Sequence, residues 1–439
     1  MMTAPLARRW ATAVAFALGT SSPARAQVTA FVDVSVLPMD RDTVLARSTV
    51  IVTGDRITAL GPVASTPVPA GARRIDGGGR SFLIPGLIDA HVHLELGERR
   101  WLPIFLAYGV TTVFNLRGEA RHLALRAAID SGVTIGPSVF TAGPYVNLPM
   151  IANEDDARRA VAEQSAAGYD FLKIHGNLTG PAFRTLADEA RRAKVALIGH
   201  APRNLPFDSV LANRQPMVAH VEEILYTHFR TSADTAGVGA LAARMREAGV
   251  WLTPNLSAYA LIARQIGDTA VIDSFVAAAP PAFLDSALMQ VWRSGMYTKR
   301  PASGAPGYAR NSVFLSQVTG ALHRGGVRML AGTDTPLPGL APGASLLLDL
   351  RLLREAGLSP YAALATATSN AGQFIAESVR PELRVGVVAV GARADLVLLG
   401  GNPLVDASVL EKPSGVMARG VWHDRARLDG FLRAGDAKR

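Results

Sequence analysis

Six side chains of the kinds that bind metal ions stand at or near the ends of expected strands. They are His91, His93, Lys173, His200, His220 and Asp334. His91 and His93 are two residues apart on an expected strand, so both imidazoles point to the same face. Such a pair of neutral imidazoles is a good clamp for a zinc ion. Taken alone, the pair is also compatible with two partly buried histidines that bind nothing.

Lys173 is the unusual member of this group, because the chain has only five lysines against forty arginines. It lies in the apolar segment YDFLKIH (169–175), where a charged ammonium group is costly to bury. Desolvation lowers the pKa of a lysine and makes its amine nucleophilic toward carbon dioxide, and a carbamylated lysine is a carboxylate that can bridge two metal ions. A lysine paired with an acidic neighbour and a Schiff-base lysine are the alternatives. The four histidines favour the metal site.

Three further side chains complete the expected metal site. His200 and His220 end two consecutive expected strands, and we expect them to bind a second metal ion. Asp334 lies in AGTDTP, where it can bind the first ion, accept a proton from metal-bound water and pass it to the leaving group. The alternative for Asp334 is a helix N-cap. The chain has no cysteine, so a metal ion must be held by nitrogen and oxygen ligands, which suits a catalytic zinc site.

The elements that would position these side chains alternate between β-rich runs and helical patterns, which is typical of parallel βα units in an α/β fold. We count eight expected strands, at 83–94, 110–116, 137–143, 169–175, 195–200, 217–220, 250–254 and 327–334. Eight such units predict a closed (β/α)8 TIM barrel, whose active site lies at the C-terminal ends of the strands. The six candidate ligands would therefore converge.

The two ends of the chain predict a second, smaller domain. Residues 27–80 and 384–439 both alternate β-type residues with glycine turns, and we expect them to form one small β-sandwich beside a barrel over 81–383. The stretch from 255 to about 320 is longer than one connection needs and contains the loop-like segment 298–311. We expect a lid or substrate-covering subdomain there.

Residues 1–26 have the pattern of a secretory signal peptide. Arg8 and Arg9 precede the short apolar stretch 10–19, and a small-x-small cleavage site ends at Ala26. This order of features favours a signal peptide over a frayed helix, and the apolar stretch is too short to span a bilayer. We therefore expect a periplasmic or secreted protein with no membrane contact after cleavage.

The charge pattern bears on partners. The formal net charge is +9, and removal of Arg8, Arg9 and Arg25 lowers it to +6. The basic residues are scattered along the chain, without a basic run interleaved with aromatic residues, so a nucleic-acid partner is not expected. Apolar residues make up 49% and charged residues 18%, which is a globular composition. We expect a small-molecule substrate and a homo-oligomer.

At its motifs the chain resembles the amidohydrolase superfamily, in the binuclear branch with a carbamylated lysine. These motifs are PGLIDAHVHL, FLKIH, GHAP, AHVEEI and AGTDTP, with EAGLSPYAALATATSNAGQFI and VGARADLVLLGGNPL near the C-terminus. The chain is most similar to imidazolonepropionase-like members that act as Xaa-Pro dipeptidases or cleave N-acyl amino acids. The resemblance implies two Zn2+ ions: the first on His91, His93 and Asp334, the second on His200 and His220. Carbamylated Lys173 would bridge both.

The implied activity is hydrolysis of an amide or peptide bond in a small substrate by a hydroxide that bridges the two metal ions. Asp334 and Lys173 would be the catalytic side chains, and other divalent metal ions fit the same ligands. A lactonase, a carbamate hydrolase, a phosphotriesterase and an inactive exported binding protein are the alternatives. A deaminase fits less well, because mononuclear deaminase sites need no lysine on the fourth strand. The motif GHAPRN at the fifth expected strand lacks the second histidine that is often found there. The sixth expected strand ends in AHVEEI and not in the commoner EHG. These departures bear on the assignment of the substrate.

Five residues that follow expected strands are candidate substrate contacts: Tyr226, His228, Tyr145, Arg117 and His175. A tyrosine or histidine can polarise the scissile carbonyl, and an arginine can hold a substrate carboxylate. Ordinary packing or a solvated loop is the alternative for each of them. His122, His323 and His423 fall in expected helical or C-terminal surface segments, and we assign them no function.

Overall fold

The computed structural model describes residues 27–95, 98–230 and 235–433. The expected signal peptide, residues 1–26, lies outside these ranges. No helix within them is both long and apolar enough to cross a bilayer.

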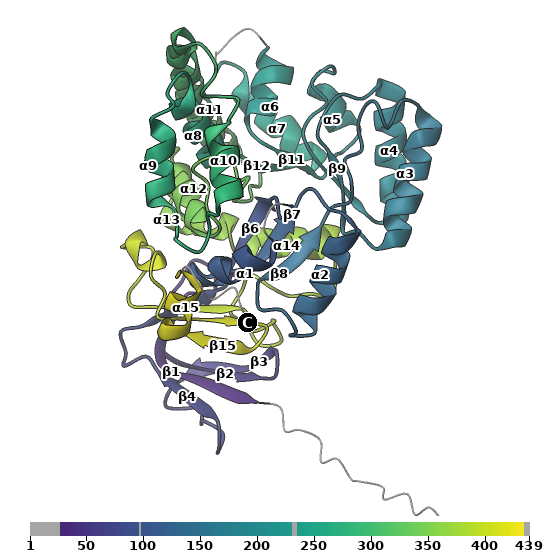
Figure 1. Cartoon of the computed structure of the whole chain (residues 1–439). Coiled ribbons are helices and arrows are strands. Elements are labelled where there is room, and N and C mark those ends of the chain that lie inside the picture. The colour runs from purple at the N-terminus through teal and green to yellow at the C-terminus, as the bar shows by residue number, and fades with distance from the viewer. Residues whose placement is uncertain (1–26, 96–97, 231–234, 434–439) are drawn as a thin grey trace, which may run out of the picture.

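Both ends of the described chain meet in one mixed sheet, at the bottom of Figure 1. Its strands are β1 (Val28–Val36), β2 (Leu45–Thr53), β3 (Arg56–Pro62), β4 (Arg73–Asp76), β5 (Phe82–Pro85), β13 (Leu396–Leu399), β14 (Gly415–Ala418) and β15 (Val421–Asp424). The order is β15-β14-β13-β5-β1-β2-β3, with β4 paired to β1. The expected β-sandwich is wrong. Because β5 pairs with β1 on one side and β13 on the other, the two ends share a single sheet.

Parallel strands form two further sheets above the end sheet (Figure 1). The first is β6-β7-β8 and the second is β12-β11-β10-β9. Their bounds are β6 (Leu87–Val92), β7 (Val110–Asn115), β8 (Ser138–Thr141), β9 (Phe171–Ile174), β10 (Ala196–Gly199), β11 (Met217–Ala219) and β12 (Trp251–Thr253). Each lies within one of the first seven expected strand ranges, and an isolated parallel bridge between Ala142 and Phe171 links the sheets.

The eighth expected strand, 327–334, is not a strand in the structure. Its surroundings contain only isolated parallel bridges, from Met329 to Leu252 of β12 and from Thr335 to Val92 of β6. Asp334 has a φ of +63°, and this left-handed conformation interrupts an extended ladder. In the part of the chain that the structure describes, the parallel strands therefore form two sheets and not a closed barrel.

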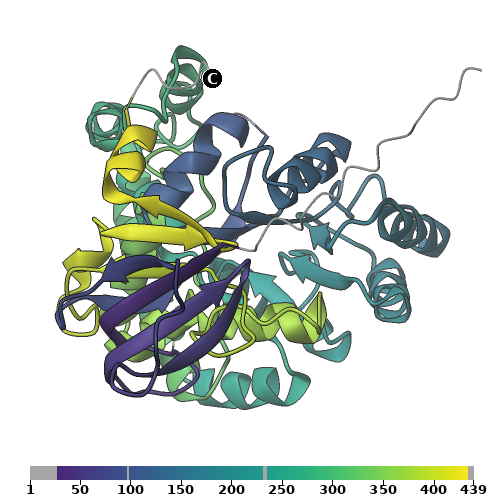
Figure 2. The ribbon, with the colours of Figure 1, turned by 90° about the horizontal axis from the view of Figure 1, so that it is seen from below.

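Helices surround the parallel strands, as the view from below in Figure 2 shows. They are α1 (Glu98–Ala107), α2 (Ala120–Asp130), α3 (Glu154–Ala167), α4 (Gly180–Ala193), α5 (Asp208–Ala212), α6 (Glu222–Ile224), α7 (Val238–Ala248), α12 (Ala344–Glu355), α13 (Pro360–Thr366) and α14 (Ser369–Ser378). A further helix, α15 (Arg425–Phe431), packs against α1 and against β15 of the end sheet. Helix α4 illustrates why they form: the Thr179 side chain caps its first turn, Phe183 and Leu186 face the core, and Lys194 ends it in a left-handed conformation. Side-chain capping and an apolar stripe stabilise such a helix.

The long stretch after β12 is mostly helical. It contains α8 (Leu256–Gln265), α9 (Val271–Ala278), α10 (Ser286–Arg293), the short 3-10 turn η2 (Ala302–Gly304) and α11 (Ala305–Arg324). The expected loop over 298–311 is therefore wrong in its second half, where α11 begins. The indole of Trp292 donates a hydrogen bond of 2.9 Å to the carbonyl of Pro336. This bond ties α10 to the chain just beyond Asp334.

Candidate metal centre

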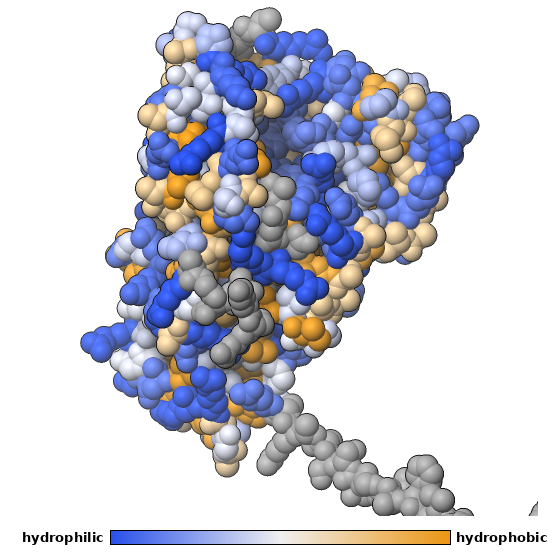
Figure 3. Space-filling model, viewed as in Figure 1, coloured by the Kyte–Doolittle hydropathy of each residue, from blue (hydrophilic) through white to orange (hydrophobic). Residues whose placement is uncertain are grey.

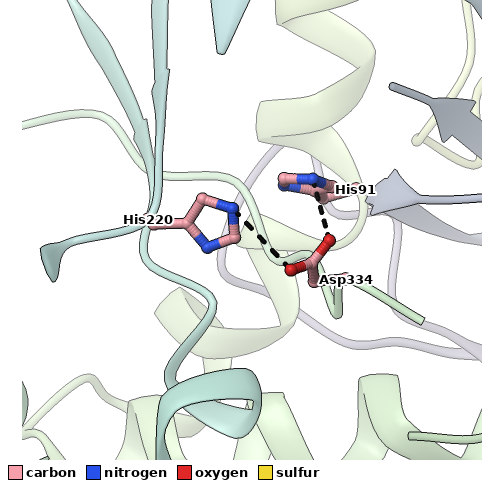
Figure 4. Close-up of side chains that lie close together, drawn as sticks. All are labelled: His91, His220 and Asp334. Carbon is pink, nitrogen blue, oxygen red and sulfur yellow. Dashed lines mark ion pairs between the residues drawn. The ribbon is translucent and has the colours of Figure 1, made fainter. Parts of the chain in front are cut away.

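The candidate ligands lie at the carboxyl ends of the parallel strands. His91 belongs to β6 and Lys173 to β9, while His200 and His220 directly follow β10 and β11. The ligand atoms of His91, His220 and Asp334 all lie within 4.8 Å of one another. Figure 4 shows the two imidazoles on either side of the Asp334 carboxylate. The structure thus brings these three side chains together from distant parts of the chain.

Asp334 is the centre of this group. Its Oδ1 lies 3.2 Å from Nε2 of His91 and 2.9 Å from Nε2 of His93, and its Oδ2 lies 3.9 Å from Nε2 of His220. Burial alone would raise the pKa of Asp334, but the adjacent histidines hold it well below its usual range. Burial would lower the pKa of His93, yet its contacts with Asp334 and Glu95 raise it to about 9. The group therefore contains an ionised carboxylate in a buried setting.

Two of the converging residues have strained backbones. His220 and Asp334 have φ values of +70° and +63°, a left-handed conformation that is uncommon for side-chain-bearing residues. Such strain costs about 1–3 kcal/mol per residue and persists only where the surroundings enforce it. Gly199 also has a positive φ, of +113°, which glycine adopts without strain. A Cβ atom at this position would lie 2.6 Å from Cδ of Lys173. The backbone therefore leaves room for the Lys173 stem only with glycine at this position.

Lys173 is fully buried, and its Nζ lies 3.5 Å from Nε2 of His91. Among the described residues, no carboxylate lies within 4.0 Å of this nitrogen. Burial lowers the pKa of Lys173 to about 8. The geometry does not support a lysine neutralised by an acidic neighbour. A buried amine with a lowered pKa is the form that reacts with carbon dioxide.

His200 stands beside the three-residue group without belonging to it. Its ring centroid lies 4.7 Å from that of His220, but its Nδ1 is 2.8 Å from Oε1 of Glu223. Glu223 is buried and also accepts hydrogen bonds from Arg203. A carboxylate on one imidazole nitrogen orients the ring so that the other nitrogen can bind a metal ion. Sequence reasoning missed Glu223 and Arg203, although the acidic pair in AHVEEI was a visible signal.

Asp89 is a second residue that sequence reasoning missed. Its Oδ1 accepts hydrogen bonds from the backbone N–H groups of His91 (3.2 Å) and Thr333 (3.1 Å), and its Oδ2 accepts one from the Thr333 hydroxyl (2.8 Å). These bonds join β6 to the segment that carries Asp334. Burial raises the pKa of Asp89 to about 8. An aspartate inside the apolar run GLIDAHV was the available signal.

Replacing Asp89 by alanine is expected to lower the free energy of unfolding by about 1–3 kcal/mol, because the buried backbone N–H of His91 would lose its acceptor. The N–H of Thr333 would keep the carbonyl of His91, 3.2 Å away. Asp89→Asn is the matched control, since an amide keeps the acceptor oxygen and can donate to the Thr333 hydroxyl. Urea unfolding of both variants measures the difference. Equal urea midpoints for Asp89→Ala and the unaltered protein would show that Asp89 does not join the two segments.

Three candidate substrate contacts lie together on the β6–β9 side of the group. The rings of Tyr145 and His175 stack at 4.5 Å, and the Arg117 guanidinium lies 5.3 Å from the Tyr145 centroid. Glu95, which sequence reasoning missed, links them to the centre: its Oε1 is 3.3 Å from Arg117 and 3.5 Å from Nδ1 of His93. Burial, and then the charge of Glu95, raises the pKa of Tyr145. Its phenol therefore stays protonated.

Tyr226 and His228 lie in a π-helical turn, η1 (Leu225–Phe229), but they have different surroundings. Tyr226 packs under Arg203, whose guanidinium lies 4.5 Å from the ring centroid. Burial lowers the pKa of His228, and the charges that act on it next belong to Asp208 and Arg244, away from the metal group. The structure thus brings Tyr226, and not His228, toward the candidate ligands.

Two of the three histidines without an assigned function differ from expectation in their burial, while His323 is partly exposed in the last turn of α11. His122 and His423 are buried, not on the surface. Nδ1 of His122 accepts the backbone N–H of Glu119 at the start of α2, and the His423 ring packs edge-on against Phe431. Local hydrogen bonding and ring packing keep these histidines inside, and they lie outside the metal group.

The donor set of the group fits a divalent metal ion. His91, His220 and Asp334 offer two nitrogens and one oxygen, which is a common zinc combination. Two ligands of one tetrahedral zinc ion, each at about 2.1 Å, lie about 3.4 Å apart. The 3.2 Å between His91 and Asp334 already suits such an ion, whereas the wider separations in the group would have to close when an ion binds. Figure 3 shows a recess with hydrophilic walls on the face of the molecule between the α8–α11 side and the β9 side.

Comparison with curated proteins shows what this chain is similar to. A family model described as the Amidohydrolase family matches residues 82–423. An ochratoxinase of Aspergillus niger is 36% identical over 101 residues, which are 23% of this chain and 19% of that protein. An adenine deaminase of Methanoculleus marisnigri is 30% identical over 151 residues, 30% of this chain and 28% of that protein. The chain thus matches less than a third of the length of either relative.

Solved structures share the fold over nearly the whole chain. A putative prolidase from Bifidobacterium longum superposes with a TM-score of 0.69 at 23% identity, covering 93% of this chain and 98% of that one. The A. niger ochratoxinase structure has a TM-score of 0.67 at 18% identity, covering 94% and 99%. At such identities the likeness extends to the fold alone.

Proposed function

Since the chain belongs to the amidohydrolase family, we propose that it is a metal-dependent hydrolase. Its proposed substrate is a small molecule with an amide or peptide bond, such as a dipeptide, an Xaa-Pro dipeptide or an N-acyl amino acid. The observation that carries the proposal is the convergence of the buried His91 and His220 with the partly buried Asp334, with Lys173 within 3.5 Å of His91. Nothing in the packing of a binding protein requires four such groups in contact.

The proposed frame for this site is a (β/α)8 barrel over 81–383. Seven parallel strands support it, and so do the isolated bridges Ala142–Phe171, Leu252–Met329 and Val92–Thr335, which lie at the gaps between the two sheets. Near-complete coverage of the prolidase and ochratoxinase structures agrees with it. In such a barrel, strand ends that are distant in sequence face one another.

Two zinc ions are the proposed cofactors. His91, His93 and Asp334 would hold one ion, His200 and His220 the other, and a carbamylated Lys173 would lie between them. Bound there, zinc would polarise the scissile carbonyl and lower the pKa of water to about 7. The buried amine of Lys173, which has no carboxylate within 4.0 Å among the described residues, supports this assignment.

The side chains around the site have separate tasks in the proposed reaction. Asp334 takes the proton of the attacking water and gives it to the leaving nitrogen, since its carboxylate is ionised and central. The protonated Tyr145 phenol donates a hydrogen bond to the substrate carbonyl oxygen. Arg117, which is more than half exposed and only partly engaged by Glu95, holds a substrate carboxylate.

A metal analysis and a substrate panel test this function. We expect close to two zinc equivalents in the purified protein, as well as cleavage of Xaa-Pro dipeptides or N-acyl amino acids. Lactones, phosphotriesters, carbamates and adenine complete the panel. Activity confined to lactones or phosphotriesters would contradict the assignment of amide hydrolysis. Release of ammonia from adenine would instead identify adenine deamination, the activity in the name of the M. marisnigri relative. A protein that retains no metal and cleaves nothing would be a binding protein.

A further inference from the structure

Glu222 is a buried carboxylate beside the metal group whose hydrogen-bonding capacity is unmet. It is the second residue after His220 and only 9% exposed. Its Oε1 lies 3.6 Å from Nδ1 of His220, which is too far for a hydrogen bond. Its Oε2 is buried and has no hydrogen-bond partner among the described residues. An unpaired buried carboxylate oxygen is costly, so its presence requires an explanation.

The neighbouring Glu223 shows that the local packing can satisfy a carboxylate. Glu223 is 2.8 Å from Nδ1 of His200 and accepts three hydrogen bonds from Arg203, at 2.6 to 3.1 Å. Arg203 is thereby engaged, and Glu222 has no arginine or lysine within 4.0 Å among the described side chains. The two adjacent carboxylates therefore have different surroundings. Glu223 is paired with His200 and Arg203, whereas Glu222 has no comparable partner among the described residues.

Three tyrosines respond to the charge of Glu222. They are Tyr226 of η1, Tyr259 of α8 and Tyr297, in the turn before η2. Burial, and next the charge of Glu222, raises the pKa of Tyr226 and of Tyr297, and the charge of Asp334 adds to the effect on Tyr297. A carboxylate and tyrosine rings can together bind an ammonium ion.

We propose that Glu222 binds the free α-ammonium group of the substrate, so that the enzyme prefers dipeptides with an unblocked amino terminus to N-acyl amino acids. This inference rests on the proposed amide hydrolysis and narrows its substrate class. In a dipeptide a single carbon atom separates the amino nitrogen from the scissile carbonyl, so its partner must lie beside the reacting group. Glu222 meets this condition through its position next to His220. The ammonium N–H groups supply the donors that the Glu222 carboxylate lacks, whereas an acyl group would leave this carboxylate unpaired.

Two substrates that differ only in the amino group test the proposal: alanyl-proline and propionyl-proline. We expect the unaltered protein to cleave alanyl-proline with a kcat/KM at least about a hundredfold higher, because a site built to pair a polar group rejects the analogue that lacks it. Glu222→Gln should lower kcat/KM for alanyl-proline by about 30-fold or more and change that for propionyl-proline by less than about threefold. Bound zinc should be unchanged. Glu355→Gln, at the exposed end of α12, is the matched control and should alter neither substrate.

Other outcomes distinguish the ways in which the proposal can fail. An equal loss on both substrates, accompanied by loss of zinc, would mean that Glu222 acts only through His220. Faster cleavage of propionyl-proline by the unaltered protein would overturn the ammonium site and leave amide hydrolysis standing. No cleavage of any amide would contradict the proposed function itself. If Glu222→Gln does not fold, Glu222→Asp provides the test: it keeps the charge, so a preference for alanyl-proline must persist in it.

Discussion

Replacing Lys173 by alanine is expected to lower kcat/KM by at least about a thousandfold, because the proposed carbamate would be shared by two metal ions and its loss would remove metal-assisted hydrolysis. Metal content should fall with activity, and measurement of both in the same preparation checks the coupling. The structure supports this expectation because the Lys173 amine is fully buried and close to His91, and no carboxylate in the described ranges lies within 4.0 Å of it. A merely structural lysine would affect stability more than bound metal.

Two controls sharpen the Lys173 experiment. Lys412→Ala, at an exposed position in the end domain, should leave activity and metal content unchanged. Short carboxylic acids added to Lys173→Ala should restore part of the activity, because they can occupy the space of the missing carbamate. Full activity of Lys173→Ala in buffer free of bicarbonate and carboxylic acids would rule out a bridging role for this residue.

Asp334→Asn is expected to lower kcat by about a thousandfold, because an amide of nearly the same shape cannot carry a proton between water and the leaving nitrogen. Asparagine also tolerates the left-handed backbone found at this position. The melting temperature should therefore change little. Comparison of kcat, metal content and thermal unfolding separates the loss of chemistry from a loss of structure.

A change of leaving group gives the control for Asp334. An anilide with a strongly electron-withdrawing substituent needs less proton transfer to its departing nitrogen, so Asp334→Asn should retain more activity on it than on an unactivated amide. A variant that keeps kcat within about threefold of the unaltered protein on unactivated amides would exclude Asp334 from proton transfer.

Much of the fold was predictable because apolar runs and helical periods alternate regularly. The errors lie where geometry depends on distant neighbours. The expected strand 83–94 divides at Gly86, whose lack of a side chain lets the chain pass close to Thr111 between two sheets. Its first part, β5, then joins strands from both chain ends. Alternation of residues indicates strands but not which sheet they enter, so the β-sandwich prediction failed.

The convergence of His91, His220 and Asp334 was predictable from residue type and position at strand ends. The roles of their supporting carboxylates were not, because an acidic residue in GLIDAHV or AHVEEI signals a buried acid but not its partners. Asp89, Glu95 and Glu223 also make contacts that span tens to hundreds of residues. The orientation of His228 also depends on the π-helical turn, which no short-range pattern indicated. Residue type predicts which side chains gather, whereas tertiary packing decides their partners.

The place of β5 in the end sheet also has a consequence for the order of folding. Pro85 of β5 pairs with Leu396 of β13, and β6 with His91 begins only two residues after β5 ends. Contacts between such distant segments form slowly, because a long loop must close first. During synthesis, the strand that leads into the histidine pair can pair with β1 early, but it lacks its second neighbour, β13, until almost the whole chain has been made. Complete metal-binding competence should consequently appear late, and chains truncated before residue 396 should be trapped without it.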